Sequence, residues 1–564
     1  MNLPRIQSGP RAPAASGNDF DLLVIGSGAA GLSTALHAAV RGLRVCVLEK
    51  TSNIGGTSAI SGGWMWLPRN HLAQAAGISD PSADTYLQQE LGAYYRAASV
   101  AHFLASAPLA LQALEKLGLR FVDGNMIPDF HGLQKGAMTG GRSACAAAFD
   151  GALLGPWLSC LRAPIPETTL WGMSIAAGAD MRLFFKAGRD LPAAWYVGKR
   201  LMRYFWQKIR HGRNTHLVNG QSLVAQLLYF CLQRGVCIYT EQEVIKLVQE
   251  QVGQDRRVLG VETASHAFSA SRGVVLACGG FPHDYLRQKD YLPFQAHYSA
   301  APKTNTGDGL RLAESLGAQV ADATQLAAAA AWVPVSQVPQ KDGSVVHFPH
   351  LVERGKPGLI AVTAKGKRFG NEANSYYDMM SALLAENETH AYLIADHRFV
   401  RRYGLGAVKP WPMPLGRFVK NAYLKRAASI AELAELCAIE REALCQTVAT
   451  FNTHARDGSD PLFHRGETPY NCMQGDAEQL PNPCVAPLLK APFYAVRIEL
   501  GSLGTFAGIQ CDEHGRVLDT QQQVIAGLFA VGNDRNSVMG GYYPAGGITL
   551  GPAIAFSYSL AQYV

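Results

Sequence analysis

The sequence predicts an α/β fold in which a parallel-sheet, nucleotide-binding domain is interrupted by a second lobe of α+β type. Three observations support this prediction. A complete βαβ pattern lies near the N-terminus, within residues 21–49. Short apolar runs that end in glycine pairs or polar residues follow at 273–281 and 527–534, as parallel strands beside a ligand would. Between them, from about 298 to 490, the parallel-strand rhythm gives way to mixed strands and a long helical stretch.

The first element in the chain is the βαβ unit. Residues 21–25 (DLLVI) predict a buried parallel strand, and Gly26, Gly28 and Gly31 then form a G-x-G-x-x-G fingerprint that opens a helix. Gly26 permits the tight turn, Gly28 lets the backbone approach a pyrophosphate, and Gly31 lets the helix pack on the strand. The second strand ends on Glu49, which can accept hydrogen bonds from ribose hydroxyls and would repel a 2′-phosphate. The unit predicts a dinucleotide site at the helix N-terminus; the alternative is a glycine-rich turn of another α/β fold.

The segments that pair with this unit indicate which dinucleotide binds. Gly55–Gly56 and Gly62–Gly63 flank small hydroxyl residues. Because these residues have little or no side chain, the backbone can lie against a large flat ligand. Near the C-terminus, GLFAVGND at 527–534 predicts a short strand ending in Gly-Asn-Asp, which suits hydrogen bonding to a polyol. NAD has no ribityl chain and FAD has one, so these segments favour FAD.

The fingerprint, the GGTSAISGG segment and GLFAVGND resemble the fumarate reductase/succinate dehydrogenase flavoprotein superfamily, and within it the 3-ketosteroid Δ1-dehydrogenase-like enzymes. The resemblance runs from about Asp19 to the end of the chain. It implies a Rossmann-type FAD-binding domain over 19–297 and 491–564, with an inserted α+β lobe at 298–490 that caps the substrate. Thr57 stands where some relatives attach FAD through a histidine, so we expect non-covalent FAD.

The resemblance also implies individual cofactor contacts. Val244 matches a family position whose backbone contacts adenine, and residues 304–309 (TNTGDG) match a segment near the flavin. The predicted cofactor contacts are Gly26, Gly28, Ala30, Gly31, Glu49, Lys50, Gly56, Thr57, Ser58, Ser61, Gly62, Gly63, Val244, Gly279, Gly280, Asp308, Gly532, Asn533, Asp534, Gly547, Ile548 and Thr549.

Two further motifs indicate the chemistry. GKRFGNEANSYYDMM resembles the ketosteroid dehydrogenase segment in which a tyrosine follows N-E-x-x-x, here Tyr376. VMGGYYPAGGITLGPA resembles the family pattern M-G-x-x-Y-P-x-x-G and places Tyr543 and Gly547. The resemblance implies that Tyr543 O–H and the Gly547 N–H stabilise an enolate while Tyr376, as a phenolate of lowered pKa, removes the α-proton. The alternative for Tyr376 is a plain buried aromatic residue.

The predicted substrate pocket contains Phe130, His131 and Tyr377. In the ketosteroid dehydrogenases the loop at 121–143 carries a tyrosine that lines the active site, and Phe130 and His131 occupy the matching positions here. His131 either replaces the lost hydroxyl or is a surface-loop residue. Two classes of substrate therefore remain: a 3-ketosteroid, and a simple ring ketone such as cyclohexanone or a 4-oxocyclohexane carboxylate. The chain has no second dinucleotide fingerprint, so a quinone or another diffusible carrier is the expected electron acceptor.

Three other functions remain as alternatives. A fumarate reductase-like enzyme needs arginines to clamp carboxylates, and the turn GGYYPAGGITLG contains neither Arg nor His, while Arg535 lies upstream in the cofactor-facing segment. Steroid Δ4-dehydrogenases resemble this chain but lack the Y-P-x-x-G turn. An electron-carrying flavoprotein without substrate chemistry would leave Tyr376 and Tyr543 without a role.

Composition excludes several other classes of protein. The 564 residues are 48% hydrophobic and 17% charged, which is typical of a well-buried enzyme of two or three lobes. The net charge of +7 is too diffuse to indicate nucleic acid but suits an anionic membrane surface or partner. The 11 cysteines form no C-x-x-C, which argues against a zinc ribbon, haem or disulfide framework and favours reduced thiols of a cytoplasmic protein.

Three segments carry expectations about order and location. Residues 1–18 predict a flexible tail without a signal peptide, and no run of 18 apolar residues predicts a membrane span. The stretch 459–483 is rich in Pro, Asn and Asp and predicts loop. Residues 195–213 combine aromatic residues with Lys199, Arg200, Arg203, Lys208 and Arg210 at helical spacing. This segment is either an interfacial helix at a membrane surface or an amphipathic helix packed on its own protein.

Overall fold

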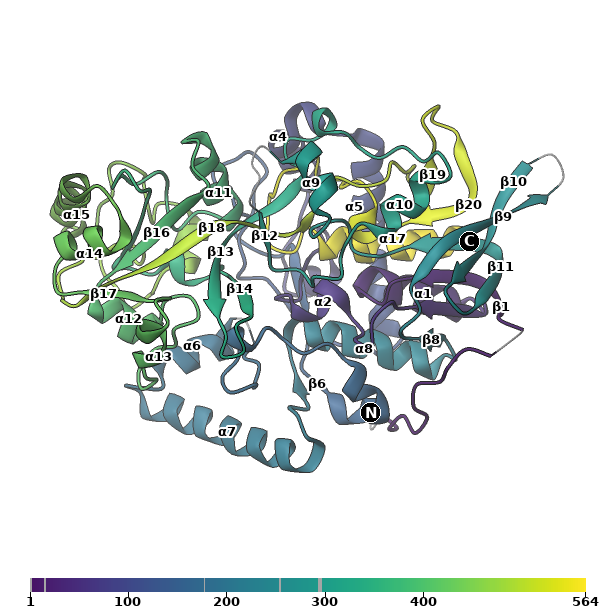
Figure 1. The fold of residues 1–564 in the computed structure, drawn as a ribbon, viewed down its shortest axis with the longest axis horizontal. Coiled ribbons are helices and arrows are strands. Elements are labelled where there is room, and N and C mark those ends of the chain that lie inside the picture. The colour runs from purple at the N-terminus through teal and green to yellow at the C-terminus, as the bar shows by residue number, and fades with distance from the viewer. Residues whose placement is uncertain (1–2, 15–16, 177, 253–254, 293–296) are drawn as a thin grey trace.

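A computed structural model describes residues 3–14, 17–176, 178–252, 255–292 and 297–564. Its strands form two large sheets that lie in two lobes side by side (Figure 1). The lobe on the right in Figure 1 contains both ends of the chain's regular structure, and the lobe on the left contains the middle of the chain. The fold is the α/β class that the sequence predicts, with mixed sheets.

The first sheet is built from the predicted nucleotide-binding strands. β1 pairs in parallel with β2 on one side and with β11 on the other, and β11 pairs in parallel with β20. Strands 500 residues apart in sequence thus share one sheet, as the motifs predict. In spatial order the sheet is β19 (Arg516–Leu518), β20 (Val524–Ala530), β11 (Ala267–Leu276), β1 (Asp19–Ile25), β2 (Val45–Leu48) and β8 (Cys237–Tyr239), with β10 (Asp255–Thr263) and β9 (Val244–Val252) added through β11.

Helices cover this sheet and fix the fingerprint at its edge. α1 (Ala29–Val40) packs between α17 (Leu550–Tyr563) and α8 (Asn219–Gln233), and α17 also packs on α5 (Ala97–Lys116). Among the described helices, α5 alone is long and apolar enough to cross a membrane. The apolar residues of α5 instead pack against α17 and against α4 (Ala83–Leu91). This packing inside the protein accounts for the length and the apolar composition of α5.

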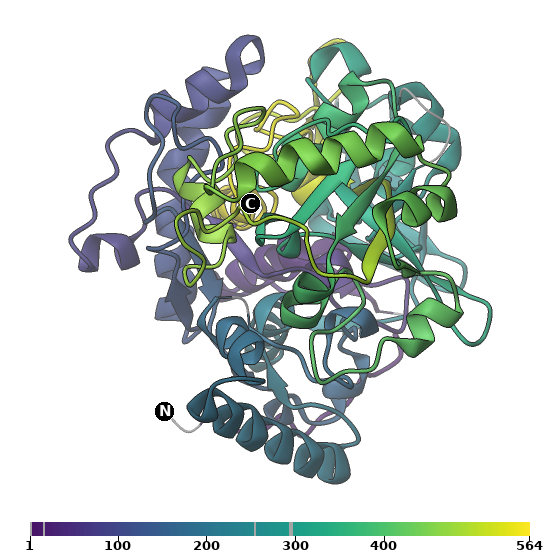
Figure 2. The same cartoon turned by 90° about the vertical axis from the view of Figure 1, so that its left-hand side faces the viewer.

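The second sheet forms the substrate-side lobe. Its order is β14 (Val345–Pro349), β13 (Ala330–Pro339), β18 (Phe493–Thr505), β16 (His390–Ala395) and β15 (Leu359–Val362), with β12 (Tyr298–Ser299) and β17 (Lys425–Ala427) paired to β18. Helices surround it, as the second view also shows (Figure 2): α11 (Tyr376–Ala385), α12 (His397–Tyr403), α13 (Gly416–Lys420), α14 (Ile430–Cys437), α15 (Arg441–Ala455) and α16 (Pro469–Gln474).

β18 differs from the expectation. The sequence places the chain back in the cofactor domain from residue 491, yet β18 pairs with β13, β16, β12 and β17 at the centre of the second sheet. The run FYAVRIELGSLGT is buried along most of its length, so its pattern predicts a strand but does not say which sheet accepts it. The return to the first sheet occurs after Thr505.

The N-terminal segment also differs from the predicted flexible tail. The Ile6 N–H donates a 2.8 Å hydrogen bond to the carbonyl of Leu153, and the Tyr229 O–H donates to the carbonyl of Pro4. Ile6 itself is buried. Two apolar residues among small polar ones carry no periodic signal, which is why the sequence does not predict this docking.

The basic amphipathic segment forms α7 (Leu191–His211), which lies along the lower left edge of the molecule in Figure 1. Arg200 points inward and pairs with Asp180 of α6 (Ala179–Lys186). The opposite face is apolar and exposed, with Leu191, Trp195, Met202, Phe205, Trp206 and Ile209 open to solvent. Half of the apolar residues of α7 are therefore packed on the protein, and these six are not covered by the described chain.

Candidate active site

A single cavity of about 1400 Å³ connects the nucleotide fingerprint to the predicted catalytic tyrosines. Its walls come from both lobes: Gly28 and Asp308 lie at one part of the lining, and Tyr376 and Tyr543 at another. A ligand that lies along the glycine-rich segments therefore opens directly onto the tyrosines.

Most predicted cofactor contacts line this cavity. They are Gly26, Gly28, Ala30, Glu49, Lys50, Gly56, Thr57, Ser58, Ser61, Gly62, Gly63, Val244, Gly279, Asp308, Gly532, Asn533, Gly547 and Thr549. Several arise from segments more than 200 residues apart, and polar contacts join them. Lys50 Nζ lies 2.5 Å from the Asp308 carboxylate of α10 (Asp308–Glu314), and Asn305 donates to Thr57 Oγ1.

Four predicted contacts lie behind the wall instead: Gly31, Gly280, Asp534 and Ile548. A Cβ on Gly31 would sit 2.0 Å from the Gly26 carbonyl oxygen, so this glycine permits the close turn and does not itself face the cavity. The fully buried Asp534 carboxylate accepts hydrogen bonds from the Cys278 and Gly280 N–H groups, and burial raises its pKa to about 6. These residues shape the backbone that faces the cofactor.

The residues at the nucleotide end fit FAD. A Cβ built on Gly28 has only Ser58 Oγ within 4 Å, and one on Gly56 has no neighbour at that distance, so the backbone here is open to a ligand. The first residues of α1 line this space, so the positive end of the helix dipole lies beside it, and the Ala29 N–H donates to Ser58 Oγ. Glu49 is buried and its carboxylate is held by Ser27 and Thr51, at the end of β2 where a ribose would lie.

At the other end of the cavity, four aromatic rings meet. Tyr376 is the first residue of α11, and its ring centroid lies 5.1 Å from that of Tyr543 in an edge-on arrangement. Phe130 stacks on Tyr543 at 5.7 Å, and Tyr470 of α16 lies 4.5 Å from Phe130. All four rings are buried in the protein and line the cavity. The structure thus brings together Phe130, Tyr376 and Tyr543 as predicted, and adds Tyr470.

Gly547 lies beside this cluster with its N–H available. Its φ of +98° and the Trp64 carbonyl, 2.6 Å from where a Cβ would be, require glycine at this position. Its carbonyl accepts a 3.0 Å hydrogen bond from the Trp66 N–H, which fixes the peptide. No described residue accepts a hydrogen bond from the Gly547 N–H. The Tyr543 O–H and the Gly547 N–H are therefore two donors in the lining of the same cavity.

The pKa of Tyr376 differs from the expected lowering. Burial raises it well above 10, the neighbouring Tyr543 and Tyr470 raise it further, and only Arg354 lowers it. Burial also raises the pKa of Tyr543 to about 12, which keeps this hydroxyl protonated as a donor. Arg354 has a buried side chain that donates to the carbonyls of His350 and Glu372, and no described carboxylate lies within ion-pair distance of it.

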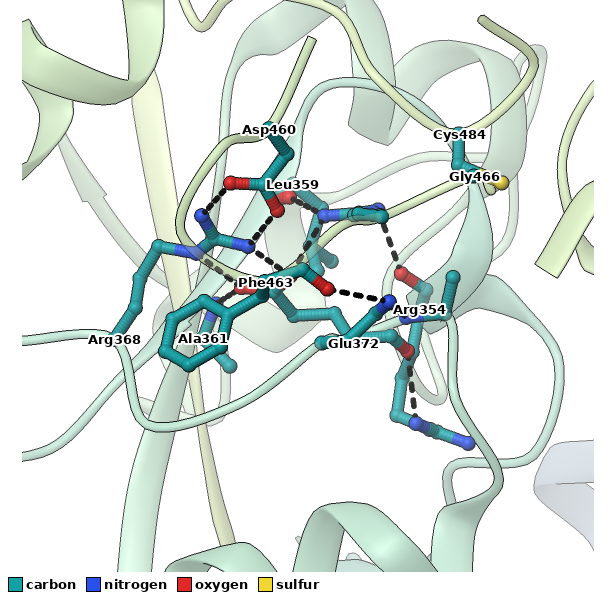
Figure 3. A network of polar contacts seen from close by, with 12 residues as sticks. Arg354, Leu359, Ala361, Arg368, Glu372, Asp460, Phe463, Gly466 and Cys484 are labelled. Atoms are coloured by element: carbon teal, nitrogen blue, oxygen red, sulfur yellow. Dashed lines mark hydrogen bonds and ion pairs between the residues drawn. The ribbon is translucent and has the colours of Figure 1, made fainter. Parts of the chain in front are cut away.

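A buried charge network fixes the segment that leads into Tyr376 (Figure 3). The Glu372 carboxylate accepts hydrogen bonds from Arg368 at 2.7 Å and from Arg465 at 3.0 Å, and Arg368 also pairs with Asp460. Although burial opposes ionisation, the two arginines lower the pKa of Glu372 to about 2. Arg354 holds the Glu372 carbonyl from the other side. The start of α11 is thereby held in place.

Two predicted pocket residues do not line the cavity. His131 lies between two carboxylates, with Nδ1 2.5 Å from Glu90 and Nε2 3.0 Å from Asp378. Burial opposes its protonation, but these two acids raise its pKa to about 10, so His131 is a charged link between α4 and α11. The Tyr377 O–H donates to the Gly541 carbonyl at 2.8 Å and points away from the cavity. Because neighbours on a helix face different directions, only one tyrosine of the pair 376–377 can face the substrate.

Sequence reasoning missed Tyr470 and Arg354. Tyr470 lies in the stretch that predicts loop, but Thr468 caps α16 through its side chain and Pro469 occupies the first turn. This Thr-Pro pattern is a helix start signal, so the short helix could have been found. Arg354 carries no local signal because its partners are backbone groups from other segments.

Comparisons with known proteins identify the family of the chain. The family described as FAD binding domain matches residues 21–550, so the chain belongs to this family of FAD-binding flavoproteins. Within it, the chain is an FAD-dependent oxidoreductase of the 3-ketosteroid Δ1-dehydrogenase-like group, as the following relatives show.

The 4-oxocyclohex-2-ene-1-carboxylate 5-dehydrogenase of Sinomonas cyclohexanicum is 38% identical over 96% of this chain and 93% of the relative. The 3-oxosteroid 1-dehydrogenase of Mycolicibacterium smegmatis is 33% identical, with 97% of each chain covered. The 3-ketosteroid delta1-dehydrogenase from Sterolibacterium denitrificans, solved with 1,4-androstadiene-3,17-dione, superposes with a TM-score of 0.88 at 32% identity over 97% of this chain and 99% of that one.

Proposed function

We propose that this enzyme desaturates a cyclic ketone beside its carbonyl group, removing a proton from the α-carbon and a hydride from the β-carbon. The observation that carries the proposal is the juxtaposition of Tyr376 with the donor pair Tyr543 and Gly547 in the FAD-binding cavity. Relatives whose names describe dehydrogenation of ring ketones support it.

Each group has a defined part in the reaction. The α-proton of a ketone is weakly acidic, so the enolate oxygen needs donors as charge develops, and Tyr543 O–H with the Gly547 N–H provides them. The Tyr376 oxygen accepts the α-proton, and the electron pair of that C–H bond forms the new C=C bond. FAD, when bound, supplies the acceptor for the β-hydride. The aromatic walls exclude water from the enolate.

An anaerobic titration followed at the flavin absorbance tests this proposal. Purified holoenzyme is titrated with a 3-ketosteroid, with cyclohexanone and with 4-oxocyclohexane carboxylate, and succinate serves as the control. We expect at least one ketone to bleach the flavin and succinate to leave it oxidised. Bleaching by succinate alone would contradict the proposed roles of Tyr376, Tyr543 and Gly547, and an electron carrier would respond to none of these ketones.

The structure offers no support for a fumarate reductase-like clamp at Arg535. Its guanidinium lies 3.7 Å from the centre of the Phe556 ring and donates to the Asp512 carbonyl. Arg535 does not line the large cavity. The reductase and Δ4-dehydrogenase structures that superpose with TM-scores of 0.62 are 21% identical to this chain and share its fold.

We propose further that α7 rests on an anionic membrane surface, from which a quinone could take up the electrons. Exposed aromatic and aliphatic residues alternate along α7 with Lys199, Arg203, Lys208 and Arg210, the combination that favours an interfacial helix. We expect the wild type to co-sediment with phosphatidylserine vesicles, and a Trp195→Glu/Trp206→Glu/Ile209→Glu variant to remain in solution with unchanged activity towards a soluble acceptor. Wild-type protein that stays in the supernatant, or that forms a dimer through α7, would contradict membrane contact.

A further inference from the structure

The part of the cavity away from the nucleotide contains a half-buried lysine without an acidic partner. Lys356 follows η5 (Glu353–Gly355), lines the cavity and donates one 2.7 Å hydrogen bond from Nζ to the Gly475 carbonyl. No described carboxylate lies within ion-pair distance of this ammonium group. The acid that acts on it most, Asp476, is already paired with Arg402 and accepts a hydrogen bond from the Tyr403 O–H.

A second cation faces the same space. Arg182 of α6 lines the cavity close to Lys356 and is exposed at its edge, and no described carboxylate pairs with it either. Two nearby acids also line this part of the cavity, and both already have partners: Asp180 pairs with Arg200, and Glu353 pairs with His350. This part of the cavity therefore has an excess of positive charge.

Burial makes that excess charge unfavourable unless a ligand compensates it. Burial lowers the pKa of Lys356 to about 8, the direction expected for an ammonium group that loses water and gains no anion. A bound carboxylate would restore the missing partner through a charge-assisted hydrogen bond. The rest of this wall is apolar, with Phe185, Leu405, Val408, Trp411 and Met473.

Lys356 is also placed at a fixed position relative to the reacting rings. Gly475, its acceptor, directly follows α16, and Tyr470 at the other end of α16 packs against Phe130. Gly475 lies five residues beyond Tyr470, a rise of about 8 Å along the helix axis, which is comparable to the length of a six-membered ring with groups at opposite ends. Arg465 holds the Lys356 carbonyl at 2.8 Å and Glu372 at 3.0 Å, so one side chain braces both Lys356 and the segment before Tyr376.

We propose that Lys356, assisted by Arg182, binds a carboxylate on the substrate, so that this enzyme acts on ring ketones carrying an acid group away from the ketone. The inference rests on the proposed function and specifies its substrate class. The acid can belong to a single-ring keto acid or to the side chain of a steroid, and the two share the same recognition chemistry.

Paired substrates that differ only in charge test the inference. The first pair is 4-oxocyclohexane carboxylate and its methyl ester; the second is a 3-ketosteroid with a carboxylate side chain and its methyl ester. Lys356→Met should lower kcat/KM for the acids by about tenfold to a hundredfold, the value of a hydrogen bond to a charged group, and change the esters less than twofold. Lys356→Arg should recover most of the loss. The pair with the higher wild-type kcat/KM identifies which source of acid is used.

Lys409 provides a matched control. It lines the same cavity and burial lowers its pKa to about 8 as well, but it donates to the Glu167 carbonyl, and the Glu167 carboxylate, which forms no ion pair among the described residues, is the acid that acts on it most. Lys409→Met should leave the acid-to-ester ratio within twofold of wild type. An equal loss for acid and ester in Lys356→Met, or the same change of ratio in Lys409→Met, would overturn the assignment.

A ligand without a ketone separates this inference from the proposed function. Cyclohexane carboxylate cannot be desaturated by enolate formation, and its binding is measured by calorimetry on the holoenzyme. We expect binding to wild type that weakens at least tenfold in Lys356→Met. If no ketone bleaches the flavin but this difference is found, the carboxylate subsite stands without the proposed reaction. If esters are oxidised and cyclohexane carboxylate binds both proteins equally, the reaction stands and the subsite is wrong.

Discussion

At the scale of single residues, the site is a set of donors and one acceptor held at contact distance. Tyr543 and Gly547 line the same cavity, and Tyr376 lies edge-on to Tyr543. Motif spacing predicts these three residues because each belongs to a continuous pattern of the chain. Local patterns do not predict Tyr470 and Arg354, since Tyr470 packs on Phe130 from a distant segment and the Arg354 side chain binds backbone carbonyls 4 to 20 positions away.

Replacing Tyr543 by Phe removes one donor and keeps the ring that packs on Phe130. Loss of one oxyanion donor lowers kcat by about a hundredfold to a thousandfold in other enzymes, and we expect a loss of that order here. Stopped-flow bleaching of the flavin by the best ketone measures it. The flavin spectrum and content serve as the control, and a variant with full activity would contradict the role of the hydroxyl.

Arg354 should control the pH dependence of the reaction. In the proposed reaction, activity requires deprotonated Tyr376. Burial, Tyr543 and Tyr470 raise the pKa of this residue, and Arg354 lowers it. The rate therefore rises with pH, and Arg354→Met should shift this rise to higher pH, while Arg354→Lys shifts it less. The pH profile of kcat/KM shows the effect, and an unmoved profile in a folded variant would mean that Arg354 only holds the backbone.

At the scale of elements, α11 is positioned by charges that lie outside it. Glu372 joins Arg368 and Arg465, and Ser375 caps the helix by accepting a hydrogen bond from the Asp378 N–H. The helix itself follows from its sequence, but the network links residues 90 positions apart and has no local signature. The sequence therefore predicts where Tyr376 lies in the chain and not what keeps it in place.

Glu372→Gln should destabilise the protein strongly. Removing one partner of a buried ion pair leaves uncompensated charge and costs about 3–5 kcal/mol, whereas Glu435→Gln in the exposed Arg441–Glu435 pair should cost less than about 1 kcal/mol. Denaturant unfolding of the holoenzyme measures both. Because the folded pKa of Glu372 is about 2 against its usual 4.5, its contribution is present above pH 4.5 and is lost as pH falls towards 2. Equal stability of the two variants would contradict the network's role.

At the scale of the whole molecule, the cavity depends on both lobes. The βαβ unit and the C-terminal strand belong to one sheet as the motifs predict, whereas β18 belongs to the other. Local patterns identify strands well, but the sheet that a buried strand joins is decided by long-range pairing, which one sequence does not display. The same limit applies to His131, whose two acidic partners come from different helices.

FAD should stabilise the folded protein as a whole. Its predicted contacts extend from Gly26 to Thr549, so binding joins distant parts of the chain. Ligand at one hundred times its Kd adds about 2.7 kcal/mol to the free energy of unfolding. Protein stripped of FAD should therefore melt at a lower temperature, and the melting temperature should rise with added FAD. A melting temperature independent of FAD would contradict this arrangement.

The wall formed by α6 and α7 has a consequence for protein engineering. Met181, Phe185, Tyr196 and Leu201 line the cavity from this wall, while Tyr376, Tyr543 and Gly547 are held by other elements. Segment 165–213 can therefore be exchanged between homologues as a cassette that changes what enters the cavity while the proton acceptor and the oxyanion donors keep their places. In such enzymes, changes in the residues that line the cavity can alter the range of substrates while the reacting residues stay the same.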